Sequence, residues 1–239
     1  MQEDVAIQLL ELSPGGISER MITEDLMAAY NLCLDQQVVV GTGPSTGTTG
    51  GLLGLYPASN WSALSVTNTQ SAPTGPTTFQ TFGVQASQIA QNRYNNTNIQ
   101  FLVHPRRGYA YVTSLDGASS KPFVESAGFY PFQPGAVEET DVAEGLIARL
   151  PFGPGIYISN NVPTTANTNQ DPFIAFKTDD VWLFEGDMRV RVLQEVLSGT
   201  LQVRFQAYNY VGMIVRYGGS IAIATGTGCA PPTANAGSY

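Results

Sequence analysis

The chain is organised around one stretch, ISERMITEDLMAAYNLCLDQQVVVG, which covers residues 17–41. Four apolar side chains recur in it at intervals of four, three and four residues: Ile22, Leu26, Ala29 and Cys33. This spacing is typical of a helix with one buried face. Gly41 follows the pattern, and glycine commonly ends helices. We therefore expect a helix from Ile17 to Val40, about 36 Å long, against which the rest of the chain packs.

The composition indicates a globular chain with unusually few charges. Its 239 residues are enough for one large domain or two small ones, and 43% of them are hydrophobic. Only 13% are charged, about half the usual share, with 19 acidic residues against 11 basic ones. The longest basic run is Arg106-Arg107, whereas a nucleic-acid-binding face needs clustered bases. Such a surface suits a protein that is largely covered by neighbours.

Several residue types argue against cofactor chemistry. Cys33 and Cys229 lie too far apart for a disulfide framework or a zinc spacing, so we expect buried or free thiols. His104 is the only histidine, and next to a proline it is more typical of a helix cap or a core position than of a metal ligand. No apolar run is long enough to span a membrane. The sequence therefore predicts no cofactor, no metal site and no membrane partner.

After the long helix, short strands predominate. We expect two further helices, one with Phe82, Ala86 and Ile89 on its buried side and one beginning at Pro105. Apolar runs predict four strands: Ile99–Val103, Ile156–Ile158, Phe173–Phe176 and Val181–Phe184. Two later runs, Val211–Val215 and Ile221–Ala224, predict last strands or a short helix. The sequence thus indicates the α+β class.

The clearest strand pattern lies between residues 188 and 208. Val190 and Val192 alternate with Arg189 and Arg191, and a second alternating run places Arg204 among glutamines. The turn signal LSGT, residues 197–200, separates the two runs. We expect a long antiparallel hairpin with one apolar face and one face of arginine and glutamine. The arginines on that polar face are our candidates for contacts with acidic groups of neighbouring subunits.

Two other segments have alternative interpretations that we disfavour. The loop GTGPSTGTTGG, residues 41–51, lacks the lysine that a phosphate-binding loop needs, so we interpret it as a connection. An acidic cluster could resemble the carboxylate pair of a glycosidase: Glu138, Glu139, Asp141 and Glu144. A solvated acidic loop is the better interpretation, because the chain has one histidine and no motif of a serine or cysteine nucleophile. We therefore expect that the protein is not an enzyme.

Four segments in order resemble the major capsid protein of tailed double-stranded-DNA bacteriophages, whose shell fold is shared with encapsulins. They are EDLMAAYNLCLDQQVVVGTG (24–43), FLVHPRRGYAYVTSLDG (101–117), GPGIYISNNVP (153–163) and FKTDDVWLFEGDMRVRV (176–192). The resemblance implies a spine helix at residues 17–41, a hairpin at 188–208, and these domains: 1–48 with 173–208 peripheral, 49–172 with 209–228 axial, and 229–239 a flexible tail. The family's N-terminal arm and extended loop need more than the sixteen residues before Ile17, so either the natural chain is longer or this shell lacks those clasps.

The resemblance also implies a function. The chain would be a structural subunit that self-assembles as hexamers and pentamers into an icosahedral virion capsid, formed in the bacterial host cytoplasm. It would enclose double-stranded DNA without sequence-specific binding. A portal would be one of its partners, and decoration or scaffolding proteins would be others. The candidate assembly residues are Arg189, Arg191, Arg204 and, on the spine, Leu26. An encapsulin-like compartment that holds a cargo enzyme is the alternative, because it shares the fold.

Overall fold

The computed structural model describes residues 2–8, 17–43, 51–57, 60, 68–70, 79–92, 98–113, 145–150, 153–165, 169–193 and 195–225. Its helices are α2 (Ile17–Val40), α3 (Phe79–Asn92) and α4 (Pro105–Thr113). Its strands are β1 (Gln2–Ala6), β2 (Asn68–Gln70), β3 (Ile99–Val103), β4 (Leu146–Arg149), β5 (Gly155–Ile158), β6 (Phe173–Lys177), β7 (Val181–Glu185), β8 (Arg189–Leu193), β9 (Gln202–Tyr208), β10 (Val211–Val215) and β11 (Ile221–Ala224).

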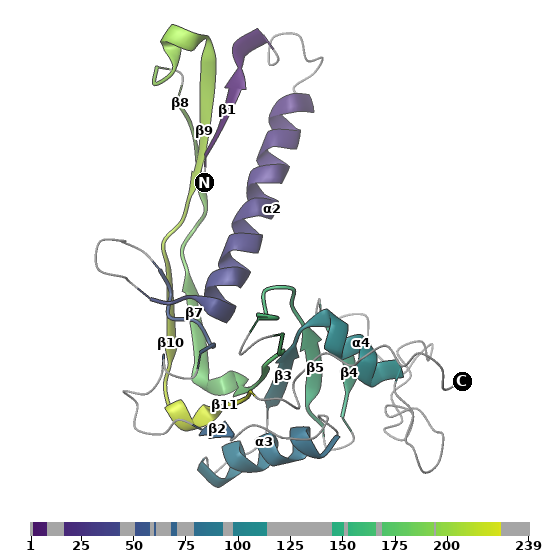
Figure 1. Cartoon of the computed structure of the whole chain (residues 1–239). Helices are drawn as coiled ribbons and strands as arrows, with labels where there is room; N and C mark the ends of the chain where they lie inside the picture. The colour runs from purple at the N-terminus through teal and green to yellow at the C-terminus, as the bar shows by residue number, and fades with distance from the viewer. Residues whose placement is uncertain are drawn as a thin grey trace, which may run out of the picture.

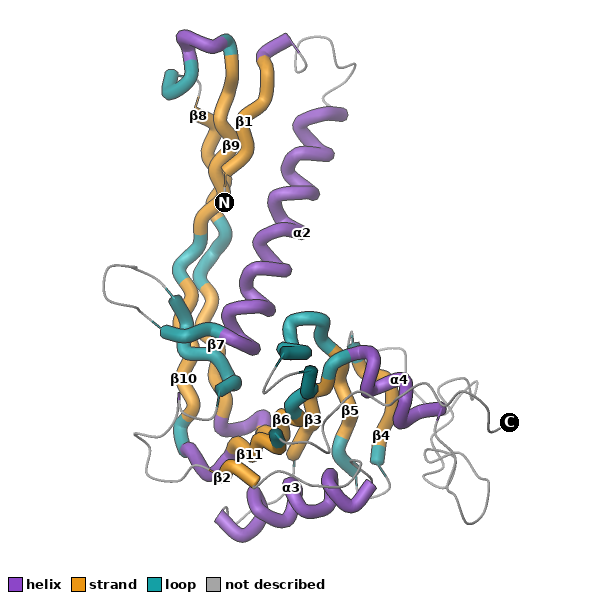
Figure 2. Tube along the Cα trace, in the orientation of Figure 1, coloured by secondary structure: helices purple, strands orange, loops and turns teal. Residues whose placement is uncertain are grey.

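The molecule consists of a body around a sheet and an arm that rises from it. In Figure 1 the long helix α2 and the strands β7 to β10 run side by side along the arm, and α3 and α4 lie at the body. Figure 2 shows the same division, with two long strand pairs beside one uninterrupted helix. The expected α+β class, the three helices and the strands near each expected apolar run are confirmed. No helix of the described residues is both long and apolar enough to cross a membrane.

The body is built on a mixed six-stranded sheet with the order β2-β11-β6-β3-β5-β4. The central strand β6 pairs antiparallel with both β3 and β11. Its residues Phe173, Ile174 and Ala175 are all fully buried, because both faces of the sheet are covered. We expected residues 173–177 to belong with the peripheral hairpin, but β6 pairs within this sheet instead.

Each face of the sheet has its own hydrophobic cluster. On one face, Phe82 of α3 and Tyr111 of α4 pack against Phe101 and Phe173 of the sheet. The ring of Phe82 meets those of Phe101, Tyr111 and Phe173 edge-on, at centroid distances of 4.9, 5.1 and 5.2 Å, a favourable geometry. On the other face, Val39 from the end of α2 packs with residues of β6, β10 and β11. The C-terminal end of α2 is thereby anchored in the body.

The helix α2 has the predicted bounds, but its buried stripe differs from the prediction. Ile22 and Leu26 are buried as expected, whereas Ala29 and Cys33 are exposed. The half-buried residues further along are instead Tyr30 and Leu34. The contacts therefore follow one ridge of residues four apart, which winds round the helix. A straight stripe requires strands that run parallel to the helix, and these cross it at an angle.

Gly41 ends α2 as predicted. A Cβ atom at this position would lie 2.3 Å from the carbonyl oxygen of Leu52 and 2.4 Å from that of Gln37. Only glycine permits this approach. The chain leaving the helix is held further by Asn60, whose side-chain amide donates hydrogen bonds to the carbonyls of Gly41, Gly54 and Tyr56. Most of the expected connecting loop at 41–51, all of the acidic cluster at 138–144 and the tail at 229–239 lie outside the described residues.

Candidate assembly surface

Strands β7 to β10 form one long ribbon with a single irregularity. β7 pairs antiparallel with β10, and the last pair is Glu185 with Val211. β8 pairs antiparallel with β9, and the first pair is Arg189 with Tyr208. Between these pairs, residues 186–188 on one strand face only residues 209–210 on the other. One extra residue on the β7–β8 side makes this a β-bulge.

The bulge decides which way the arginines face. Side chains alternate along a strand, so Arg189 would share the face of Glu185 if the strand were regular. The extra residue reverses this alternation, and Arg189 and Arg191 instead lie on the same face as Trp182 and Phe184. We call this the outer face of the ribbon. The inner face contacts α2, because Glu185 and the buried residue Phe205 both lie on it.

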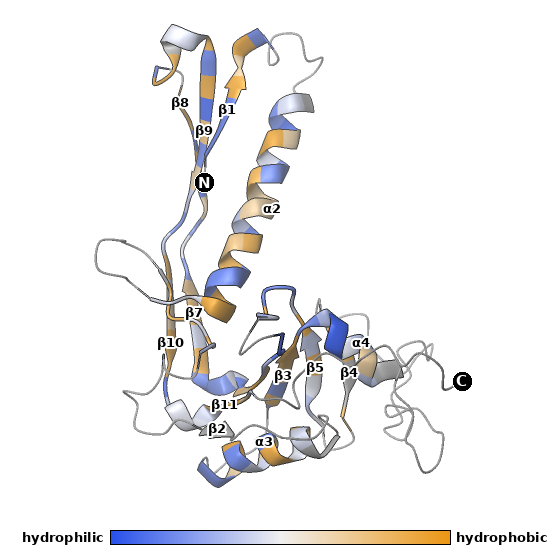
Figure 3. Cartoon of the chain, in the orientation of Figure 1, coloured by the Kyte–Doolittle hydropathy of each residue, from blue (hydrophilic) through white to orange (hydrophobic). Residues whose placement is uncertain are grey.

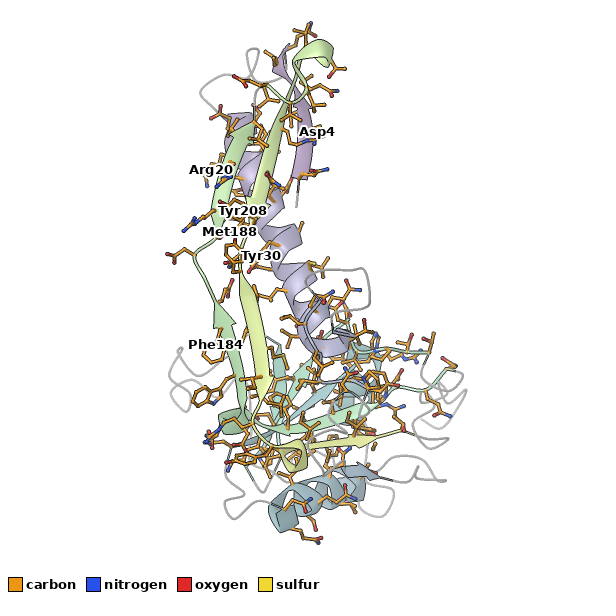
Figure 4. The ribbon with its side chains drawn as sticks, turned by 90° about the vertical axis from the view of Figure 1, so that its left-hand side faces the viewer. Asp4, Arg20, Tyr30, Phe184, Met188 and Tyr208 are labelled. Carbon is orange, nitrogen blue, oxygen red and sulfur yellow. The ribbon has the colours of Figure 1, made fainter. Side chains whose placement is uncertain are left out.

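The lower half of the outer face is apolar and aromatic. Trp182, Phe184 and Ile214 are exposed by 46%, 56% and 50%, and Tyr210 by 79%. Ile214 pairs with Trp182, and Gly212 pairs with Phe184, so these residues share one face. Figure 4 looks onto the ribbon from this side, with Phe184 on β7. An exposed group of this kind is typical of a surface that another molecule covers.

The upper half of the outer face carries the predicted arginines. Arg204 donates hydrogen bonds of 2.7 and 2.8 Å from Nε and Nη2 to the two carboxylate oxygens of Asp4 on β1. These bonds hold the pKa of Asp4 below its ordinary value. Arg191 lies with its guanidinium carbon 4.8 Å from the ring centroid of Tyr208. Among the described residues, the ion pair of these arginines lies within the chain, between Arg204 and Asp4. Contacts of the arginines with acidic groups of neighbouring subunits stay a prediction.

The inner face is joined to α2 by a small polar network at the bulge. The hydroxyl of Tyr30 donates a hydrogen bond of 2.8 Å to Glu185, and the amide of Asn209 donates to both Tyr30 and Glu185. The side-chain oxygen of Asn209 accepts from the backbone N–H of Tyr210. Burial and the Glu185 carboxylate raise the pKa of Tyr30. Asn209 thus uses both ends of its side chain to fix the ribbon at its irregular point.

The fourth predicted assembly residue, Leu26, is 4% exposed and packs inside the chain. Its neighbours include Val203 and Phe205 on the inner face of β9, together with Val5 of β1. It therefore supports a surface by holding the helix to the ribbon. Sequence reasoning missed the aromatic half of the outer face. The available signal was the run VWLF at 181–184, which places large apolar residues on both faces of a strand.

The arginine pair and the histidine near the start of α4 have structural roles. Arg106 and Arg107 both contact the fully buried carboxylate of Asp171, Arg106 through Nε and Nη2 and Arg107 through Nη2 at 3.5 Å. His104 caps α4, because its Nδ1 accepts from the backbone N–H of Arg106 at 3.2 Å. Burial lowers the pKa of His104, which keeps Nδ1 available as an acceptor. His104 thus takes the cap, one of the two roles that the sequence predicted for it.

Comparison with known proteins shows which fold this arrangement of helices and strands belongs to. No family model and no curated protein sequence matches the chain. Solved structures do match it over nearly its whole length. The capsid of a native GTA particle has a TM-score of 0.62 at 14% sequence identity, covering 95% of this chain and 71% of that one. The structure from Mycobacterium phage Che8 has a TM-score of 0.57 at 13% identity, covering 94% and 68%.

The chain has the tailed-phage capsid fold. An encapsulin, in the holo-SrpI complex from Synechococcus elongatus PCC 7942, matches as well, with a TM-score of 0.59 at 13% identity, covering 100% of this chain and 76% of that one. The resemblance predicted from four sequence segments is therefore confirmed at the level of the fold.

Proposed function

We propose that this protein is the structural subunit of an icosahedral phage capsid, assembling with copies of itself as hexamers and pentamers. The observation that supports this most is the match to capsid structures over 94–95% of the chain. The ribbon adds support, because an arm with an exposed aromatic face has little purpose in an isolated monomer. Weak contacts repeated between many identical subunits add up to a stable closed shell.

The proposed shell encloses double-stranded DNA without binding its sequence. The chain has a net charge of −8, so a wall of such subunits does not condense DNA by attraction. The DNA is instead driven in by other machinery and confined, which requires a portal at one vertex. Scaffolding or decoration proteins are further proposed partners, the mature location is the virion, and the assembly occurs in the bacterial cytoplasm. The subunit has no enzymatic role in this proposal.

The proposed domain division follows the three hydrophobic clusters. A peripheral part contains β1, α2 and the paired strands β8 and β9, which share the cluster around Leu26. An axial part contains the six-stranded sheet with α3 and α4. Residues 173–177 belong to the axial part, since β6 is the centre of its sheet.

The experiment that tests the proposal is assembly of the purified protein. We expect closed particles with hexameric and pentameric units in electron micrographs, and double-stranded DNA in particles taken from the natural source. Absorbance ratios measure the DNA, and asymmetric image reconstruction shows whether one fivefold vertex is replaced by a portal. A protein that stays monomeric at all concentrations and ionic strengths would contradict the proposal.

The encapsulin-like compartment is the second candidate, supported by the match to an encapsulin over the whole chain. The same particles distinguish the two functions. A protein cargo, no DNA and twelve equivalent vertices would favour the compartment. DNA and a single distinct vertex would favour the phage capsid.

A further inference from the structure

Among the exposed apolar residues of the arm, two groups lie on separate surfaces. One is the lower half of the outer face of the ribbon, which carries Trp182, Phe184 and Ile214. The other lies on α2, where Met21 and Leu32 are exposed by 59% and 63% and Ala28 is exposed between them. Figure 3 shows hydrophobic residues along both α2 and the ribbon. Within the described part of the chain, neither surface is covered.

The apolar surface on α2 follows its own regular stripe. Met21, Asp25, Ala28 and Leu32 recur at intervals of four, three and four residues, and all of them are exposed. At 100° per residue the mean direction of this stripe lies more than a quarter of a turn from that of the ridge of Ile22, Leu26, Tyr30 and Leu34 that faces the ribbon. The side of α2 formed by Met21, Asp25, Ala28 and Leu32, which we call the free side of α2, is therefore a second helical face prepared for packing.

The helix α2 and the ribbon carry opposite net charge. The helix α2 carries Glu19, Glu24, Asp25 and Asp35 but only Arg20, a net charge of −3 (four acids, one base). The ribbon, counted over 181–193 and 202–217, carries four arginines and two acids, a net charge of +2. One of those arginines, Arg216, is exposed and stacks on Trp182 with a distance of 5.3 Å from its guanidinium carbon to the ring centroid. The aromatic surface is thus bordered by positive charge.

We propose that the outer face of β7 and β10 in one subunit packs on the free side of α2 in a neighbouring subunit. The inference rests on the proposed self-assembly and adds which two surfaces meet. Aromatic and aliphatic side chains on both sides supply the apolar contact, and Arg216 comes near the acidic side chains of the helix. Complementary charge fixes which surfaces pair and in which orientation.

A contact between two outer faces is the main alternative within the same shell. It would bring Arg216, Arg189 and Arg191 of one copy toward the same arginines of the other, and like charges oppose such a pairing. A contact between two free sides of α2 would in turn bring acids together. Pairing unlike surfaces avoids both penalties. It also repeats from subunit to subunit, as a ring or shell requires.

Single-cysteine variants test the contact directly. In a background with Cys33→Ser and Cys229→Ser, one preparation carries Leu32→Cys and a second carries Phe184→Cys. The two are mixed before assembly, and the particles are treated with a short bismaleimide that joins two thiols. We expect a product of dimer mass on a denaturing gel only from the mixture. Pairing Leu32→Cys with Glu195→Cys, which is exposed outside both surfaces, is the matched control and is expected to give none.

The possible outcomes separate this inference from the proposed function. Dimers from Phe184→Cys alone would overturn the proposal in favour of a contact between like surfaces. Particles without any product would overturn it and leave the aromatic face to another protein. If Phe184→Cys does not assemble, Ile214→Cys on the same face replaces it. If the cysteine-free protein forms no particles, the proposed function fails, while the soluble mixture still decides the contact by the presence or absence of the Leu32–Phe184 product.

Discussion

Large apolar residues are buried in the body of this molecule, whereas several are exposed in the arm. In the body, Phe101 and Phe173 are fully buried between α3, α4 and the sheet. In the arm, Phe184 is exposed by 56% although it also lies in a regular strand. In the body, α3 and α4 cover one face of the sheet and the end of α2 with β10 covers the other, whereas in the arm α2 lies only against the inner face of the ribbon. The body is therefore complete as a single chain, and the arm keeps apolar surface available for a partner.

One fold thus combines a body that is stable within a single chain with an arm that is available for assembly. The end of α2 anchors the arm in the body through Val39, and Tyr30, Ile22 and Leu26 hold α2 to the ribbon within the arm. Changes at the anchor should disturb both regions, changes in the body should affect folding, and changes on the outer face should affect assembly alone. The following predictions test this order.

The largest effect is expected for Leu26→Asp. It places a carboxylate in the cluster with Val203 and Phe205, where burying an unpaired charge costs several kcal/mol. We expect the arm to detach from α2 and particles to be lost, measured by electron microscopy and by chemical unfolding. The neighbouring change Met27→Asp is the control, because Met27 is 49% exposed. Normal particles from Leu26→Asp would show that this side of α2 is misplaced.

A matched pair of phenylalanines should separate folding from assembly. Phe101→Ala removes a fully buried ring, which costs about 3–5 kcal/mol of the free energy of unfolding. Phe184→Ala removes an exposed ring and should change that free energy by only about 0.5 kcal/mol. Denaturant titration measures both values, and sedimentation measures assembly. We expect Phe184→Ala to fold normally but to give fewer particles; an unchanged particle yield would mean that the outer face is not used.

A smaller effect is expected when the three arginines of the outer face are removed together. Exposed ion pairs contribute little to a single chain, so the triple variant Arg189→Ala, Arg191→Ala and Arg204→Ala should fold. Its particles should dissociate at lower temperature, because the loss is repeated at every contact. Arg204→Ala alone reports the part that comes from the bond to Asp4. Equal particle yield and heat resistance in the triple variant would count against an assembly role for this half of the ribbon.

The smallest effect concerns pH and the cap of α4. Burial holds the pKa of His104 below its ordinary value of 6.5, so the folded protein binds fewer protons than the unfolded chain just below that pH. This contribution to stability is present above pH 6.5 and is lost as the pH falls through the lower folded pKa. We expect His104→Asn, which retains a capping acceptor, to lose less of its unfolding temperature than the natural protein between pH 8 and pH 5. An identical loss in both would show that His104 does not titrate here.

The sequence by itself determined where the helices and strands lie along the chain. The spacing of apolar residues predicted α2 at Ile17–Val40, the helices α3 and α4, and the strands. This was possible because the period of apolar residues differs between a helix and a strand. It also predicted the arginine face of the hairpin and the cap at His104. The ordered segments that resemble tailed-phage capsid proteins then predicted the fold.

Only the tertiary structure decided which faces are covered. The helix crosses the ribbon at an angle, so its contacts moved from Ala29 and Cys33 to Tyr30 and Leu34. No described element packs over the outer face of the strand VWLF, residues 181–184, so Trp182 and Phe184 stayed exposed. The bulge at 186–188 turned Arg189 and Arg191 to the side of Phe184. Crossing angle, strand partners and register arise between segments far apart in the chain, and local periodicity does not encode them.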